Sequence, residues 1–249
     1  MNNLYCGNCV DIMQTFPDGC IDLTVTSPPY DNLRDYEGYD FDFESIAKEL
    51  YRVTKDGGAV VWVVGDATIN GSETGTSFRQ ALHFKDIGFK IHDTMIYLKP
   101  NFSAVVALRV RYAPVFEYMF VFVKGKLTTF NPLKDRPCKE CVKTGNIRNR
   151  DGTMKRMSNE GRAYGKEGFG QRYNVWQINP QSNGHPAPFP EALARDHILS
   201  WSNVQDMVLD PMCGSGTTCI AAKKLNRKYI GIDCSEKYIE MTKERLKHE

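Results

Sequence analysis

Three short segments carry residue types that could bind or activate a small molecule. The first, Thr26-Ser27-Pro28-Pro29-Tyr30, follows a short β-rich run. Two successive prolines remove two N–H donors and leave acceptors: the Ser27 hydroxyl and the Ser27 and Pro28 carbonyls. These acceptors suit an exocyclic amino group, because they hold its two hydrogens and turn its lone pair toward an electrophile. Tyr30 offers a flat face for a stacked base, although a rigid loop with a packed tyrosine explains the same residues.

The second segment is a loop of small residues, Asp210-Pro211-Met212-Cys213-Gly214-Ser215-Gly216-Thr217-Thr218, between a predicted strand and a predicted helix. Glycines let the backbone bend sharply and approach a ligand closely, and the following helix offers free N–H groups. The third glycine of the dinucleotide fingerprint and the lysine of a P-loop are both missing. The loop therefore disfavours nicotinamide cofactors and nucleoside triphosphates, and a structural tight turn remains the alternative.

The third segment is Asp233, which ends the next predicted strand, 17 residues after Gly216. A carboxylate at this place can accept both hydroxyls of a ribose bound over the loop. The run from Asp233 to Glu236 also has the form of a helix N-cap region. The loop and the carboxylate together describe a nucleoside site without a polyphosphate clamp, and S-adenosylmethionine fits that description.

An alternation of strands and helices must position these segments. Apolar runs predict strands at residues 21–26, 59–64, 89–98, 115–123, 207–209 and 229–233. Helical spacing predicts helices at residues 43–53, 77–87, 191–201, 217–225 and from 235 to the end, with Lys55-Asp56-Gly57-Gly58 stopping the first. This rhythm predicts a doubly wound α/β sheet, which places catalytic groups at the carboxyl ends of its strands.

Composition is that of an ordinary globular protein. The chain has 249 residues, 41% hydrophobic and 25% charged, with a formal net charge of +2. These values exclude collagen-like, largely disordered and disulfide-scaffold proteins. No apolar run approaches the roughly 18 to 20 residues that span a bilayer, and the N-terminus does not resemble a signal peptide. We therefore expect a cytoplasmic protein without membrane contact.

The charge is unevenly distributed. Residues 134–172 contain eleven Lys and Arg and five Asp and Glu, a net of +6, which leaves −4 on the rest of the chain. Six glycines and few bulky aliphatic residues give this stretch little core of its own. A long solvated loop is one interpretation, and a segment that contacts phosphates is the other.

The eight cysteines are interpreted as cytosolic thiols. Cys6/Cys9 and Cys138/Cys141 form C-x-x-C pairs, each only half of a zinc site, and the histidines lie at no ligand spacing from them. A site shared by both pairs would join segments about 130 residues apart. Small buried or surface thiols are therefore favoured over a metal, and no metal is expected.

The combination of motifs resembles the amino DNA methyltransferases, which use S-adenosylmethionine to methylate the exocyclic nitrogen of cytosine or adenine. Matching segments are TSPPY (Thr26–Tyr30), the HPAPFP turn (His185–Pro190), DPMCGSGTT (Asp210–Thr218) and GID (Gly231–Asp233). The catalytic motif precedes the cofactor loop, an order typical of the circularly permuted β group. The resemblance implies a seven-stranded, mostly parallel Rossmann-like sheet. It also implies a strand at Leu4–Gly7 beside the one that ends at Asp233.

The resemblance also implies a domain division and a set of site residues. Residues 1–126 would form the catalytic half, 127–175 a basic target-recognition insert, and 176–249 the cofactor-binding half. Catalytic roles would fall to Ser27, Pro28, Pro29 and Tyr30. The expected cofactor-binding residues are Asn8, Thr26, His185, Pro186, Asp210, Pro211, Met212, Cys213, Gly214, Ser215, Gly216, Thr217, Asp233 and Cys234. The expected DNA-binding residues are Lys143, Arg148, Arg150, Lys155, Arg156, Arg162, Lys166 and Arg172.

Two of these positions depart from the usual pattern. Asn8, expected near the cofactor adenine, stands where the family usually has Asp, and Met212 stands where it usually has Phe. An amide at position 8 can still form a hydrogen bond with the adenine.

The implied mechanism is direct transfer to a base flipped out of duplex DNA. Ser before Pro-Pro is commoner in cytosine N4 enzymes, so cytosine is expected and adenine N6 is the alternative. An RNA or protein amide methyltransferase and an inactive DNA-binding module are more distant interpretations. A carbon-5 cytosine enzyme is disfavoured because Pro137-Cys138 lies in the basic stretch. Double-stranded DNA is the expected partner, with a cognate restriction endonuclease and a homodimer as further expectations.

Overall fold

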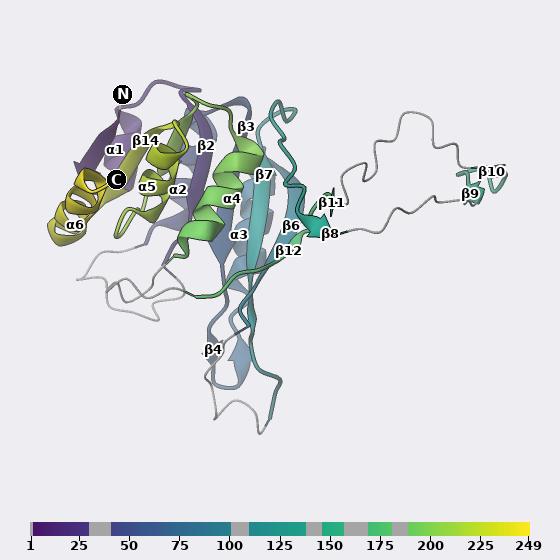
Figure 1. The fold of residues 1–249 in the computed structure, drawn as a ribbon. Coiled ribbons are helices and arrows are strands. Elements are labelled where there is room, and N and C mark those ends of the chain that lie inside the picture. The colour runs from purple at the N-terminus through teal and green to yellow at the C-terminus, as the bar shows by residue number, and fades with distance from the viewer. Residues whose placement is uncertain (1, 30–40, 101–109, 138–145, 157–168, 181–188) are drawn as a thin grey trace. The chain divides into compact units, whose positions relative to one another are not determined.

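The computed structural model describes residues 2–29, 41–100, 110–137, 146–156, 169–180 and 189–249. The chain divides into two compact units, one of Met1–Asn131 with Asn174–Glu249 and one of Pro132–Tyr173. The first unit is mixed α/β with a large central sheet, as predicted (Figure 1).

The central sheet contains eight strands within the described residues, one more than the seven predicted. In sheet order they are β1 (Asn3–Cys6), β14 (Lys228–Asp233), β13 (Met207–Asp210), β2 (Ile21–Thr26), β3 (Thr54–Val64), β7 (Phe116–Val123), β6 (Lys90–Leu98) and β12 (Val175–Gln177). The first five run parallel to one another, β7 is antiparallel to both of its neighbours, β3 and β6, and β12 is parallel to β6. The expected pairing of the N-terminal strand with the strand that ends at Asp233 is confirmed.

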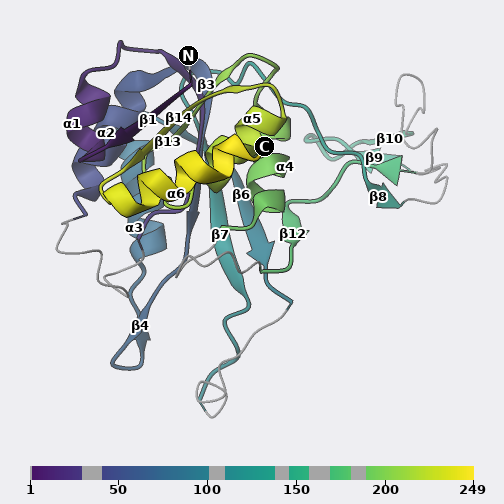
Figure 2. The ribbon, with the colours of Figure 1, turned by 60° about the vertical axis from the view of Figure 1, so that its left-hand side comes forward.

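Helices cover both faces of this sheet, which confirms the doubly wound arrangement (Figures 1 and 2). On one face lie α1 (Cys9–Gln14), α2 (Phe43–Val53) and α3 (Thr76–Asp86), and on the other α4 (Glu191–Trp201), α5 (Thr217–Lys224) and α6 (Glu236–Lys247). The helices therefore cover the middle strands of the sheet, and loops continue from the strand ends.

The core forms because apolar residues on the middle strands are covered from both sides. In β3, alternate residues Val60, Trp62 and Val64 face the helix layer of α2 and α3, and Val61 between them is equally buried. The Trp62 ring packs edge-on against Phe84, and its Nε1 donates to Gln80 Oε1 at 2.8 Å. The buried Trp62 N–H therefore has its hydrogen-bond partner inside the core.

Three local predictions were incomplete. The segment expected to stop the first long helix lies inside β3, where the pairing with β2 shifts register between Ile21/Thr54 and Leu23/Ala59. This bulge uses Gly57 at φ +84°, because a residue without a Cβ adopts that angle at little cost. Helix α1 and the small hairpin of β4 (Thr68–Ile69) and β5 (Ser72–Glu73) were not predicted.

Among the described residues of the second unit, Pro132–Tyr173, strands pair in two short antiparallel ladders. β8 (Arg136–Pro137) pairs with β11 (Phe169–Gly170), and β9 (Asn146–Arg148) pairs with β10 (Met154–Arg156). The predicted insert of residues 127–175 contains this unit, and its exact bounds stay a prediction. None of the helices that the structure describes is long and apolar enough to span a membrane.

Candidate functional site

The predicted catalytic segment begins where β2 ends, at the carboxyl edge of the parallel strands. Ser27 and Pro29 are half-buried and Pro28 is buried. β2 lies between β13 and β3, so the ends of three strands meet here. Tyr30 lies outside the described residues, and its stacking role stays a prediction.

Asp210 joins this segment to the glycine loop, defined as Pro211–Gly216. The Thr26 hydroxyl, at the end of β2, donates to Asp210 Oδ1 at 2.8 Å, and the Met212 N–H donates to the same oxygen at 3.2 Å. Thr26 is fully buried and Asp210 is 5% exposed. The two motifs, 184 residues apart in sequence, are therefore linked by a hydrogen bond in the interior.

Burial strongly perturbs Asp210. Desolvation raises its pKa to about 6, and hydrogen bonds from Thr26 and Thr218 lower it in part. The Thr218 hydroxyl also donates to the Val25 carbonyl of β2 at 3.3 Å. Uncharged groups thus donate to a buried carboxylate whose pKa the nearby Asp233 raises further, an environment that often marks a functional site.

The glycine loop bends at two positions with positive φ, Gly214 at +50° and Gly216 at +77°. Gly216 is the N-cap of α5, and its N–H donates to the Cys213 carbonyl at 2.8 Å. Pro211, Cys213, Ser215 and Thr217 are buried. A tight turn and a ligand-binding loop both require this geometry, so the surrounding groups must distinguish them.

Asp233 provides the next contact with the loop. Its Oδ2 accepts from Gly214 N–H at 2.8 Å and its Oδ1 accepts from Ser235 N–H at 2.9 Å. The carboxylate therefore holds the loop and the turn that precedes α6, whose N-cap is Ser235. Each carboxylate oxygen can accept more than one hydrogen bond, so these contacts leave the ribose-binding interpretation a prediction.

Asn8 is brought beside Asp233 by strand pairing. Cys6 is opposite Asp233 in the register of β1 and β14, and the Gly7 N–H donates to the Asp233 carbonyl at 2.9 Å. The Asn8 side chain accepts from Val10 N–H at 2.8 Å and is the N-cap of α1. Its cap role was not foreseen, and its role at the adenine stays a prediction.

Four other predicted cofactor residues have different settings. Met212 is half-buried and packs against the core of the α1–α3 face. Cys234 is half-buried, and its carbonyl accepts from Cys6 Sγ at 3.8 Å. His185 and Pro186 lie outside the described residues, directly before the segment that enters α4.

The described cysteines are all free thiols. Burial raises the pKa of Cys9 to about 11, and a hydrogen bond with Cys219 together with burial raises the pKa of Cys213 well above its usual value. Within the described part of the chain, no group of three or more His, Cys, Asp or Glu side chains could hold a metal. Cys138 and Cys141 lie outside that part.

Two functional candidates were missed in the sequence because nothing in their spacing marks them. Thr242 Oγ1 of α6 donates to the Gly214 carbonyl at 3.0 Å, and Arg245 donates to the Ser215 carbonyl. Both lie on an amphipathic helix that looks like any other surface helix. Only the tertiary contact reveals that they touch the glycine loop.

The basic residues predicted to bind DNA fall into three groups. Arg148, Arg150, Lys155 and Arg156 are exposed on or beside the β9–β10 ribbon. Arg172 forms an ion pair with Asp135, whose pKa is lowered by that hydrogen bond. Lys143, Arg162 and Lys166 lie outside the described residues.

Comparisons with known proteins identify the family. A protein-family model described as DNA methylase, covering N6 and N4 amino methyltransferases, matches residues 21–244. The orphan methyltransferase M.BamHII of Bacillus amyloliquefaciens is 52% identical over 93% of this chain and 90% of its own length. The type II methyltransferase M.HpaI of Haemophilus parainfluenzae is 30% identical over 99% of this chain and 74% of its own length.

Two solved structures share the fold. The cytosine-N4-specific PvuII DNA methyltransferase has a TM-score of 0.74 at 21% identity, over 98% of this chain and 86% of that one. The complex of M1.HpyAVI with S-adenosylmethionine has a TM-score of 0.69 at 22% identity, over 99% of this chain and 100% of that one. The chain therefore belongs to the N6/N4 amino DNA methylase family and is a DNA methyltransferase.

Proposed function

We propose that this chain methylates the N4 amino group of cytosine in duplex DNA, with the N6 amino group of adenine as the alternative. The observation that carries the proposal is the Thr26–Asp210 hydrogen bond, because it fixes the Ser27-Pro28 acceptors next to the start of the glycine loop. Family membership alone covers both bases. The preference for cytosine rests on Ser27, and the fold shared with the PvuII enzyme adds no evidence on the base.

The residues present fit S-adenosylmethionine. The glycine loop bends at two positive φ angles and contains no lysine, so it suits a nucleoside without a polyphosphate. Asp233 would accept from the ribose hydroxyls, and Asn8 would lie near the adenine, since strand pairing places both residues at the same sheet edge. A carboxylate such as Asp210 beside the loop favours a cationic ligand.

In the proposed mechanism, Ser27 and the Pro28 carbonyl accept the two hydrogens of the target amino group. Tyr30 stacks on the flipped base. S-adenosylmethionine supplies an electrophilic methyl group when it is bound. The amino nitrogen would form the new N–C bond as the bond from the methyl carbon to sulfur breaks, with S-adenosylhomocysteine as the leaving group, and it would lose one proton to solvent. No protein nucleophile is needed, so positioning and exclusion of water provide most of the acceleration.

The basic ribbon β9–β10 is the proposed DNA contact. In its antiparallel register Met154 is opposite Arg148 and Arg156 is opposite Asn146, so Arg148 and Arg156 lie on one face and Lys155 on the other. A two-stranded ribbon fits the width of a major groove. Arg172 would instead stabilise the base of the insert through Asp135.

Three further expectations also remain proposals: cytoplasmic location, a homodimer and a cognate restriction endonuclease. The relative at 52% identity is named an orphan methyltransferase, which favours an enzyme that acts without an endonuclease. Expression in a host that lacks other methyltransferases, followed by a test for restriction activity in the same lysate, separates the solitary and paired forms.

Nucleoside analysis tests the reaction and the base together. Duplex DNA is incubated with the protein and labelled S-adenosylmethionine, digested to nucleosides and separated by mass spectrometry. The proposal predicts label in N4-methylcytosine, and label in N6-methyladenine would select the alternative. Label in 5-methylcytosine, or in no nucleoside of the DNA, would refute the proposed chemistry.

A further inference from the structure

Helix α6 contacts the glycine loop from the side of its carbonyl groups. Thr242 Oγ1 donates to the Gly214 carbonyl at 3.0 Å, and the Arg245 guanidinium donates to the next carbonyl, that of Ser215. Thr242 is fully buried and Arg245 is half-buried. In Figure 2, α6 lies beside α5, the helix that follows directly after the loop.

Two N–H groups of the loop are held from other directions. Gly214 N–H donates to Asp233 Oδ2 at 2.8 Å, and Gly216 N–H donates to the Cys213 carbonyl at 2.8 Å. Each of the three peptide units between Cys213 and Gly216 therefore has a hydrogen bond that fixes its plane. Two of these planes are fixed by side chains of α6.

Gly216 and Thr242 are also complementary in shape. A Cβ on Gly216 would lie 2.3 Å from Thr242 Cγ2 and 2.6 Å from its Oγ1, which is closer than real Cβ atoms approach. The second glycine of the loop thus makes room for Thr242 as well as adopting φ +77°. The buried threonine and the glycine form one packed unit.

We propose that Thr242 and Arg245 are positioning residues for cofactor binding, an inference that rests on the proposed placement of S-adenosylmethionine at this loop. Hydrogen bonds from α6 keep the Gly214 and Ser215 carbonyls turned toward the helix. The backbone therefore holds one conformation before the ligand arrives, and binding need not order it. Neither side chain has to touch the cofactor for this role.

Calorimetric titration of the folded protein with S-adenosylmethionine tests the proposal. Thr242→Val keeps the shape and removes the hydroxyl donor, whereas Thr242→Ser keeps the donor. One net hydrogen bond is worth about a factor of 3 to 10 in affinity. We expect Thr242→Val to raise the cofactor Kd by about that factor and Thr242→Ser to stay within about twofold of the wild type.

Arg245→Met provides a second variant that retains much of the side-chain length, and we expect a similar rise in Kd. Lys243→Ala, at an exposed position paired with Glu240 on the same helix, is the matched control and should bind like the wild type. In steady-state methylation the KM for cofactor should rise while kcat and the DNA Kd stay unchanged. This KM-against-kcat split separates positioning from a general loss of folding.

A wild-type cofactor Kd in folded Thr242→Val and Arg245→Met would overturn the proposal. Equal losses in Thr242→Ser and Thr242→Val would also overturn it, because they would assign the effect to packing against Gly216. If the wild type bound cofactor but methylated no DNA, the proposed function would fail, whereas the comparison of Kd values would still decide the role of α6.

Discussion

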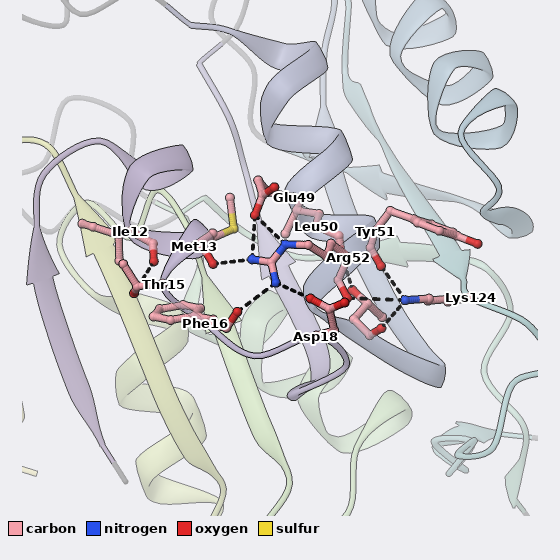
Figure 3. A network of polar contacts seen from close by, with 11 residues as sticks. Ile12, Met13, Thr15, Phe16, Asp18, Glu49, Leu50, Tyr51, Arg52 and Lys124 are labelled. Carbon is pink, nitrogen blue, oxygen red and sulfur yellow. Dashed lines mark hydrogen bonds and ion pairs between the residues drawn. The ribbon is translucent and has the colours of Figure 1, made fainter.

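Two polar clusters at opposite ends of the central sheet differ in how their charges are satisfied. At the end where β2 and β3 begin, Arg52 donates to the carbonyls of Met13 and Phe16 at 2.6 and 2.8 Å and to the carboxylates of Asp18 and Glu49 (Figure 3). These carboxylates raise the pKa of Arg52. We call these five residues the Arg52 cluster.

At the other end, where β2 and β13 finish, the buried Asp210 accepts from Thr26 and Met212, which carry no charge. Burial raises its pKa, and the neighbouring Asp233 carboxylate raises it further. The Arg52 cluster thus holds its carboxylates beside a cation, whereas the described hydrogen-bond partners of Asp210 carry no positive charge. The proposed function predicts this difference, because bound S-adenosylmethionine would supply the missing cation at the Asp210 end.

Removal of Arg52 should produce the largest change in stability. Arg52→Met leaves two carbonyls and the partly buried Glu49 without their donor, so unfolding should become easier by about 3 kcal/mol. Urea denaturation measures this loss. The methylation rate per folded molecule should not change. If the folded variant methylated DNA ten times more slowly than the wild type, the Arg52 cluster would also be needed for the reaction, and the two ends of the sheet would not differ in role.

The pH dependence of stability should identify Asp210. Its folded pKa of about 6 lies above the ordinary aspartate value of 3.8, so the folded state binds the proton more tightly than the unfolded state. The resulting stabilisation is complete below pH 4 and disappears as pH rises through 6. It amounts to about 3 kcal/mol at most.

Asp210→Asn is the matched variant, because it keeps the shape and cannot ionise. Urea denaturation of both proteins between pH 4 and 7.5 should show the stability of the wild type falling relative to the variant as pH rises. Parallel curves over this range would show that Asp210 is not the buried titrating group.

Neutralising the basic ribbon should have a moderate effect on DNA binding. Arg148→Gln with Arg156→Gln removes two exposed charges, so the slope of log K against log salt should fall by about 2. Fluorescence anisotropy at several salt concentrations measures this slope. Arg172→Gln is the control, since Arg172 is paired with Asp135, and an equal change in that variant would count against the ribbon.

A smaller gain in stability is expected from Thr24→Val. The Thr24 hydroxyl is buried in β2 and has no hydrogen-bond partner among the residues that the structure describes. Replacing an unsatisfied buried hydroxyl by a methyl group should stabilise the protein by about 1 kcal/mol. A loss of stability by urea denaturation would indicate that this hydroxyl does form a bond.

The sequence predicts regular elements well and tertiary contacts poorly. The helix Phe43–Val53 was predicted at its observed bounds, because apolar residues recur at helical spacing and a turn signal follows. β12 has three residues, too few to show a pattern, and its pairing with β6 depends on the fold. The extra strand was therefore missed.

The site shows the same limit. Asp210, Asp233 and the two glycines stand out by type and spacing, and the structure places them around one loop. Thr242 and Arg245 could not be found, because a threonine and an arginine on a surface helix carry no local signal. Asn8 is also the N-cap of α1. This local contact was not predicted, because the family resemblance assigned Asn8 to the cofactor adenine.

Thr26→Val and Thr24→Val together test the central claim, that the Thr26–Asp210 bond joins the catalytic segment to the cofactor loop. Both threonines are fully buried on β2, and of their two hydroxyls that of Thr26 donates to Asp210 whereas that of Thr24 has no partner among the described residues. In single-turnover methylation of duplex DNA, Thr26→Val should slow transfer on the order of 10- to 100-fold through misplacement of the reacting groups, while Thr24→Val matches the wild type. Equal rates for the two variants would contradict the account.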